Sequence, residues 1–147
     1  MKYLDCLFYE TTRFYQSANG IFFREASRDI VLDDIVFQKG TIFAIESVMN
    51  HYYSANYEKP LEFRPERWLG EGGKQWAPEP YTYLTFSAGP RSCIGKQLAQ
   101  LEMKLIVIKL MRDYEMEMET MDLELKMENL SYQPQKMKTR FRKRLID

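Results

Sequence analysis

The residues best suited to chemistry lie in one short loop that ends at Gly95. A single cysteine, Cys93, stands between Gly89 and Gly95, with Arg91 two positions before it. Apolar residues then recur at steps of three and four positions, which predicts a helix that begins directly after the loop. Free backbone N–H groups and the positive dipole end at a helix start favour an anion. We therefore expect the sulfur to be presented as a thiolate, which is both a nucleophile and a soft metal ligand. We also expect the two glycines to let the backbone fold around the sulfur with torsions that other residues resist.

Spacing separates the kinds of site that could use this loop. A phosphate-binding P-loop needs four residues between its glycine and the Gly-Lys pair, followed by Ser or Thr; here the gap is five residues and glutamine follows the lysine. Structural zinc needs four ligands, and the chain offers only Cys6, Cys93 and His51, without paired spacing. A nucleophilic cysteine normally needs a histidine base, for which His51 is the only candidate. A thiolate as the one protein ligand of haem iron needs a single cysteine and cationic partners for the propionates, which the loop offers. A buried loop cysteine without chemistry remains the alternative.

The loop resembles a known family. Its signature residues are similar to the cysteine-loop signature of the cytochrome P450 family, the haem-thiolate monooxygenases, most of all to eukaryotic microsomal members. The positions that carry this resemblance are Phe86, Gly89, Arg91, Cys93 and Gly95.

Two further segments are similar to this family and stand in its order. Residues 10–13, Glu-Thr-Thr-Arg, resemble the family's Glu-x-x-Arg helix, and residues 63–68 resemble its aromatic-Pro-Glu-Arg segment. Spacing alone permits a solvated pair of Glu10 and Arg13, one helical turn apart. The resemblance instead implies one buried cluster of Glu10, Arg13 and Arg67 that holds the scaffold of the cysteine loop.

The resemblance also implies a cofactor and an activity. The cofactor is haem b, iron protoporphyrin, with Cys93 as its axial ligand in a site shaped by Phe86, Gly89 and Gly95. Cations at Arg91 and Arg24 bind the propionates, although an ordinary surface arginine is the alternative for Arg24. The activity is insertion of one oxygen atom from O2 into an apolar organic substrate (a lipid, sterol or xenobiotic), with electrons from a reductase. A haem-thiolate peroxide isomerase and a catalytically inactive fragment are the alternatives.

Length and composition set limits on these readings. The chain has 147 residues, of which 45% are hydrophobic, and 21 basic side chains balance 21 acidic ones. The balance implies neither nucleic acid nor an anionic membrane as a partner, and two distant cysteines argue against a disulfide framework. No run of about 20 apolar residues is present, so we expect membrane association only through a missing N-terminal part. The family resemblance suggests the cytoplasmic face of the endoplasmic reticulum.

The predicted fold is mixed α+β, the C-terminal part of the cytochrome P450 fold. Members of that family run to several hundred residues, and no Gly-x-Asp/Glu-Thr pattern of its oxygen-activating helix occurs. We therefore expect residues 1–147 to be a C-terminal fragment of a single domain. The patterns predict helices at 3–15, 47–53 and 95–112, β-rich runs at 21–23 and 30–32, a hairpin of 36–37 with 41–45, an irregular meander at 57–85, and strands at 115–119 and 136–144.

Overall fold

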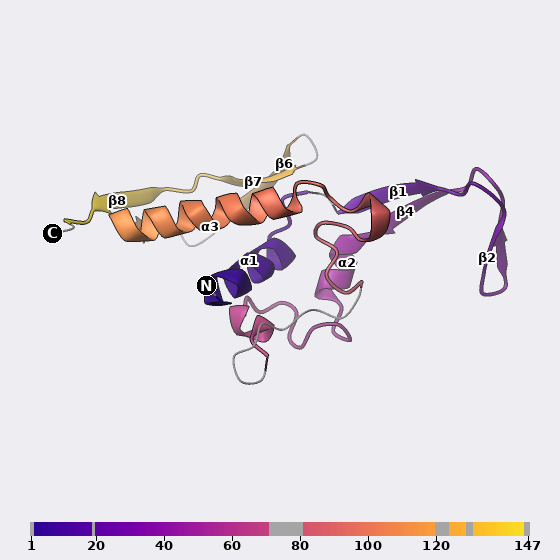
Figure 1. Ribbon diagram of the computed structural model, residues 1–147, viewed down its shortest axis with the longest axis horizontal. Helices are drawn as coiled ribbons and strands as arrows, with labels where there is room; N and C mark the ends of the chain where they lie inside the picture. The colour runs from indigo at the N-terminus through magenta and orange to yellow at the C-terminus, as the bar shows by residue number, and fades with distance from the viewer. Residues whose placement is uncertain (1, 19, 71–80, 120–123, 129–130, 146–147) are drawn as a thin grey trace.

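The computed structural model describes residues 2–18, 20–70, 81–119, 124–128 and 131–145. Figure 1 shows an elongated arrangement in which the long helix α3 and the terminal strand β8 lie toward one end and the strand β2 toward the other. Helices α1 and α2 and the irregular segment that follows α2 lie below them in this view. The predicted mixture of helices and small sheets is therefore observed.

Among the described residues, the three α-helices form where the patterns predict helix, one short 3-10 helix lies in the predicted meander, and another lies in the cysteine loop. The first α-helix has an aspartate in its first turn and an arginine in its last, as the helix dipole favours. The elements are α1 (Lys2–Phe14), α2 (Ser47–Tyr52), η1 (Pro65–Trp68), η3 (Gly89–Arg91) and α3 (Lys96–Asp113).

The described strands pair two by two and antiparallel. The strands are β1 (Ile21–Glu25) with β4 (Ile42–Glu46), β2 (Ile30–Leu32) with β3 (Ile35–Phe37), β5 (Tyr114–Met118) with β8 (Thr139–Lys143), and β6 (Glu124–Glu128) with β7 (Ser131–Gln135).

The predicted hairpin of 36–37 with 41–45 is wrong in its pairing. Gly40 does make a turn, with φ 88, but that turn leads from β3 to β4, and β4 pairs with β1. The tight hairpin is β2–β3, and its turn holds Asp33 at φ 51. The β1–β4 ribbon continues past β1, since Ala26 and Thr41 share a backbone hydrogen bond of 2.9 Å. Alternation of apolar residues identifies strands but not the partner of each strand.

The hydrophobic core is small and lies between α1 and the meander. Cys6, Tyr57 and Trp68 form it, with Tyr9 and Tyr83 packed against it. Trp68 is fully buried and stacks on Tyr9 at a centroid distance of 5.2 Å. This core fixes the irregular segment against the first helix.

The long helix α3 forms as predicted, but the structure buries none of its residues. Three leucines at steps of three and four positions, Leu98, Leu101 and Leu105, are 55–58% exposed. Polar contacts tie it to α1, where Asp5 accepts a hydrogen bond from Gln100 and pairs with Lys104. Among the described residues, no helix combines the length and the apolar character needed to cross a membrane.

Candidate functional site

One cavity of about 740 Å³ collects four of the six residues that the sequence assigns to a cofactor. Cys93, Arg91, Phe86 and Arg24 line it, and they come from the cysteine loop and from β1. The end of α1, the turn before β1 and the start of α3 complete its walls. Ala18 and Gly20, which precede β1, line the same cavity. The cavity therefore joins segments that are distant in the sequence.

The cysteine loop closes through backbone hydrogen bonds. The N–H of Cys93 donates to the carbonyl of Phe86 at 2.8 Å, and the N–H of Ser92 donates to the carbonyl of Gly89 at 3.0 Å. The ring of Phe86 stacks on Phe8 of α1 with centroids 6.0 Å apart. The side chain of Cys93 is exposed, and its sulfur carries no disulfide.

Only one of the two loop glycines uses a torsion that other residues resist. Gly89 has φ 71, in the left-handed region. Gly95, at the N-cap of α3, has φ −81, which any residue adopts, so the backbone argument made for it is wrong. A Cβ at Gly95 would lie 3.7 Å from the sulfur of Cys93, an ordinary contact. Neither glycine lines the cavity.

Two guanidinium groups face the cavity without a carboxylate partner. Within the described part of the chain, neither Arg24 nor Arg91 forms an ion pair with an acidic side chain. Arg24 is half-buried and donates to the carbonyl of its neighbour Phe23 at 2.8 Å, while Arg91 is exposed. Both positive charges are therefore available to an anionic partner.

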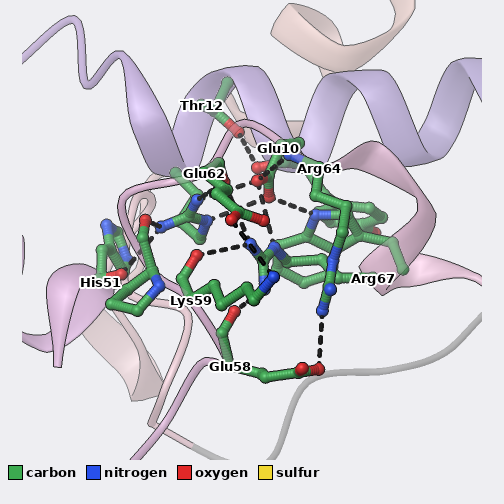
Figure 2. Close-up of polar contacts among 12 residues, drawn as sticks. Glu10, Thr12, His51, Glu58, Lys59, Glu62, Arg64 and Arg67 are labelled. Atoms are coloured by element: carbon green, nitrogen blue, oxygen red, sulfur yellow. Dashed lines mark hydrogen bonds and ion pairs between the residues drawn. The ribbon is translucent and has the colours of Figure 1, made fainter. Parts of the chain in front are cut away.

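A second site, which is buried, surrounds the carboxylate of Glu10 on α1 (Figure 2). Arg13 grips both oxygens, through Nε to Oε2 at 3.0 Å and Nη2 to Oε1 at 2.8 Å. Arg67 donates Nε to Oε1 at 3.1 Å, and Trp68 donates its indole N–H to Oε2 at 2.8 Å. The backbone N–H of Arg64 supplies a fifth hydrogen bond at 2.8 Å. The structure thus brings Glu10, Arg13 and Arg67 together, with two further donors that the sequence reading missed.

The same two arginines hold the backbone of the meander. Arg13 donates Nη1 to the carbonyls of His51 and Pro60, both at 2.9 Å. Arg67 donates to the carbonyls of Glu58, Lys59 and Glu62 at 2.7–3.2 Å. Each guanidinium therefore satisfies carbonyls that regular secondary structure would otherwise pair. The cluster, hereafter the Glu10 cluster (Glu10, Arg13, Arg67), is a structural clamp.

Electrostatics in the cluster favour the charged carboxylate. Burial, the strongest influence, raises the pKa of Glu10, but the hydrogen bonds of its partners, led by Arg13, outweigh burial and hold that pKa below its ordinary value. For the nearby imidazole of His51, the surroundings instead favour the neutral form. Burial, followed by the positive charge of Arg13, lowers the pKa of His51 to about 4.

Sequence reasoning missed the groups that hold the segment leading into the cysteine loop. His51 accepts the backbone N–H of Leu84 at its Nε2, at 2.9 Å. Thr12 shares a hydrogen bond of 2.6 Å with the hydroxyl of Tyr83, and its carbonyl accepts the hydroxyl of Thr85 at 3.1 Å. These partners lie 33–73 positions apart in the chain, so no local pattern signals them.

The cavity fits a haem by its chemistry. Its volume lies within the roughly 300–1,000 Å³ that ligand pockets span. Its lining offers a single thiol, Cys93, and two cations without a carboxylate partner among the described residues, the set that thiolate ligation and two propionates need. Among the described residues no group of three or more metal-ligating side chains gathers. A metal held here would therefore arrive with most of its own ligands.

Comparison with known proteins gives one consistent result. The family described as Cytochrome P450 matches residues 1–141. The chain is 39% identical over 119 residues to a probable cytochrome P450 12d1 of Drosophila melanogaster, described as mitochondrial, and 38% identical over 114 residues to cytochrome P450 3A15 of Cavia porcellus. These matches cover 80% and 78% of this chain.

Solved structures agree in fold. A cyanobacterial CYP120A1 with bound retinoic acid superposes with a TM-score of 0.82 at 29% identity, over 97% of this chain. The heme domain of cytochrome P450DA superposes with a TM-score of 0.80 at 26% identity. The chain spans 22–23% of the length of the two curated relatives and 33% of the CYP120A1 chain. Members of this family carry haem as cofactor, which agrees with the chemistry of the cavity. The chain belongs to the cytochrome P450 family.

Proposed function

We propose that this chain supplies the cysteine side of the haem site in a monooxygenase that inserts one oxygen atom from O2 into an apolar organic substrate. The observation that carries the proposal is the cavity that joins Cys93 to Arg24 and Arg91. One cysteine sulfur and two cations without carboxylate partners in one cavity match the iron and the propionates of haem b, and no other ligand considered for the loop needs that set.

Each residue then has a separate task. Cys93 would ligate the iron as a thiolate, and Arg91 and Arg24 would neutralise the propionates. Phe86, stacked on Phe8 of α1, keeps the loop against the first helix. The bound haem supplies oxygen activation at its iron, where thiolate ligation favours O–O cleavage.

For the setting of the whole protein we carry the family resemblance further. We place residues 1–147 in the C-terminal part of one P450 domain, with a reductase as electron donor and a lipid, sterol or xenobiotic as substrate. We assign it to the cytoplasmic face of the endoplasmic reticulum, attached through a segment N-terminal to this chain. The mitochondrial description of one relative names the competing compartment.

The first test is the absorption of the reduced carbon-monoxide complex of the haem-loaded protein. A thiolate ligand shifts the main band to longer wavelength, and Cys93→Ala removes that shift. Cys6→Ala is the matched control, because Cys6 is a buried thiol in the hydrophobic core and does not line the cavity. Survival of the shifted band in Cys93→Ala would overturn the assignment.

The second test concerns the cations. Arg24→Met and Arg91→Met should weaken haem retention, which is measured as the rate of haem transfer to an excess of a haem-free acceptor protein. Arg28→Met is the control, since Arg28 is exposed and lies outside the cavity. If all three variants retained haem as well as the wild type does, the two arginines would not belong to the haem site.

A further inference from the structure

His51 lies between the Glu10 cluster and the segment that leads into the cysteine loop. Its backbone carbonyl accepts Nη1 of Arg13 at 2.9 Å, and its Nε2 accepts the N–H of Leu84 at 2.9 Å. One residue of α2 therefore contacts both the clamp and the approach to the loop, and Figure 2 shows it at the edge of the cluster.

Backbone hydrogen bonds connect Leu84, which His51 contacts, with Cys93. The carbonyl of Leu84 accepts the N–H of Ser87 at 2.9 Å, which closes the turn that opens the loop. Between them, the carbonyl of Phe86 accepts the N–H of Cys93 at 2.8 Å. The position of Leu84 therefore helps to set the position of Cys93.

The surroundings of His51 favour the neutral form of its imidazole. The residue is fully buried, stacked on Tyr83 at 5.7 Å and edge-on to Tyr57 at 6.5 Å. The charged group that faces it is Arg13 of α1, and the other titratable groups against it are the phenols of Tyr57 and Tyr83. Nε2 can accept the N–H of Leu84 only while the proton sits on Nδ1, because a protonated imidazole has no acceptor. Among the described residues Nδ1 has no hydrogen-bond partner.

We propose that His51 is a positioning residue for the cysteine loop: its neutral imidazole holds Leu84 and so ties the place of the Cys93 thiolate to the Glu10 cluster. The inference rests on the proposed function, in which Cys93 ligates haem. Protonation of the ring removes the acceptor, places a second positive charge beside Arg13 and releases the approach to the loop.

Three variants of the haem-loaded protein test this. His51→Gln offers an amide oxygen as acceptor, whereas His51→Leu has similar volume and no acceptor. Tyr52→Phe is the matched control, since it removes a hydrogen bond of 2.7 Å to the carbonyl of Phe14 from the neighbouring position of α2 without touching Leu84.

The measurements are the thiolate band of the reduced carbon-monoxide complex as a function of pH, and the exchange rates of the Leu84 and Cys93 amide hydrogens. His51→Leu should lose thiolate band at neutral pH and exchange both amides about tenfold faster, the effect of one lost hydrogen bond. His51→Gln should restore both and should keep its band at acid pH values where the wild type loses it. Tyr52→Phe should follow the wild-type pH profile.

The outcomes separate this inference from the proposed function. A wild-type protein without a thiolate band contradicts the proposed function itself. A wild-type band that persists unchanged in His51→Leu, with the wild-type pH profile, contradicts only the role of His51. An equal loss in His51→Leu and Tyr52→Phe would show a general loosening of α2 and would also overturn the inference.

Discussion

Glu10 combines zero exposure with five hydrogen bonds to its two carboxylate oxygens. Taking such a group out of water is costly unless every lone pair is met. The spacing of Glu10 and Arg13 foretells their contact, because residues three apart share a helix face. The contacts with Arg67 and Trp68 depend on how the meander returns to α1, and only a family resemblance anticipated the first of them.

Glu10→Gln should lower the free energy of unfolding by about 3–5 kcal/mol, because it leaves two buried guanidinium groups without their counter-charge. Chemical denaturation monitored by tryptophan fluorescence measures this, since Trp68 donates to the same carboxylate. Glu62→Gln is the control. Its side chain is 54% exposed in a pair with Lys59, so its loss should stay within about 1 kcal/mol. Similar losses in both variants would show that the cluster is no stronger than a surface pair.

His51 should make the stability of the protein sensitive to mild acid. Its pKa is about 4 in the folded state and about 6.5 in an unfolded chain, so the unfolded state binds the extra proton between these values. The contribution is complete above pH 6.5 and is lost as the pH falls, by roughly 3 kcal/mol at pH 4. Denaturation curves of the wild type and of His51→Gln, recorded across this range, measure it. Parallel pH profiles for the two proteins would contradict the buried neutral imidazole.

At the scale of elements, the cysteine loop shows which features a sequence conveys. The helix after the loop, and the glycine that permits the left-handed turn at Gly89, follow from local pattern. The joining of Arg24 to Cys93 in one cavity requires β1 and the loop to converge, which the family resemblance anticipated and periodicity does not. The prediction of strand pairing was wrong for the same reason: β4 pairs with β1 and not with β3, which is nearer in the sequence.

The two loop glycines should respond differently to alanine. Gly89→Ala should cost roughly 1–2 kcal/mol, because φ 71 brings a Cβ close to the following carbonyl although no other atom crowds it. Gly95→Ala should change stability by less than about 0.5 kcal/mol, because the weaker N-cap and the lower entropy of the unfolded chain oppose each other. Thermal unfolding of the haem-free variants measures both. Equal costs would mean that Gly95 is strained in solution.

At the scale of the whole molecule, the chain exposes more surface than its size requires. Its accessible area is 11478 Å², whereas a compact monomer of this mass exposes about 7,900 Å². Helix α3 accounts for part of the excess, because it is apolar on two faces. Leu98, Leu101 and Leu105 lie on one face and are more than half exposed. The opposite face borders a cavity of about 340 Å³ with α1, lined by Met103 and Val107 among others.

Apolar helix faces that no other element covers act as uncovered core surface, and we expect this chain by itself to behave accordingly. We expect the purified chain to bind an apolar fluorescent dye under native conditions, to associate with rising concentration, and to show no substrate oxidation when supplied with haem, a reductase and reduced nicotinamide cofactor. Replacing Leu98, Leu101 and Leu105 together by glutamine should reduce dye binding and association without lowering the unfolding temperature, because these side chains contribute little packing. The control is Met49→Gln on α2, which changes a single apolar side chain that is 70% exposed. Substrate turnover by this chain alone would mean that its uncovered faces need no partner for catalysis.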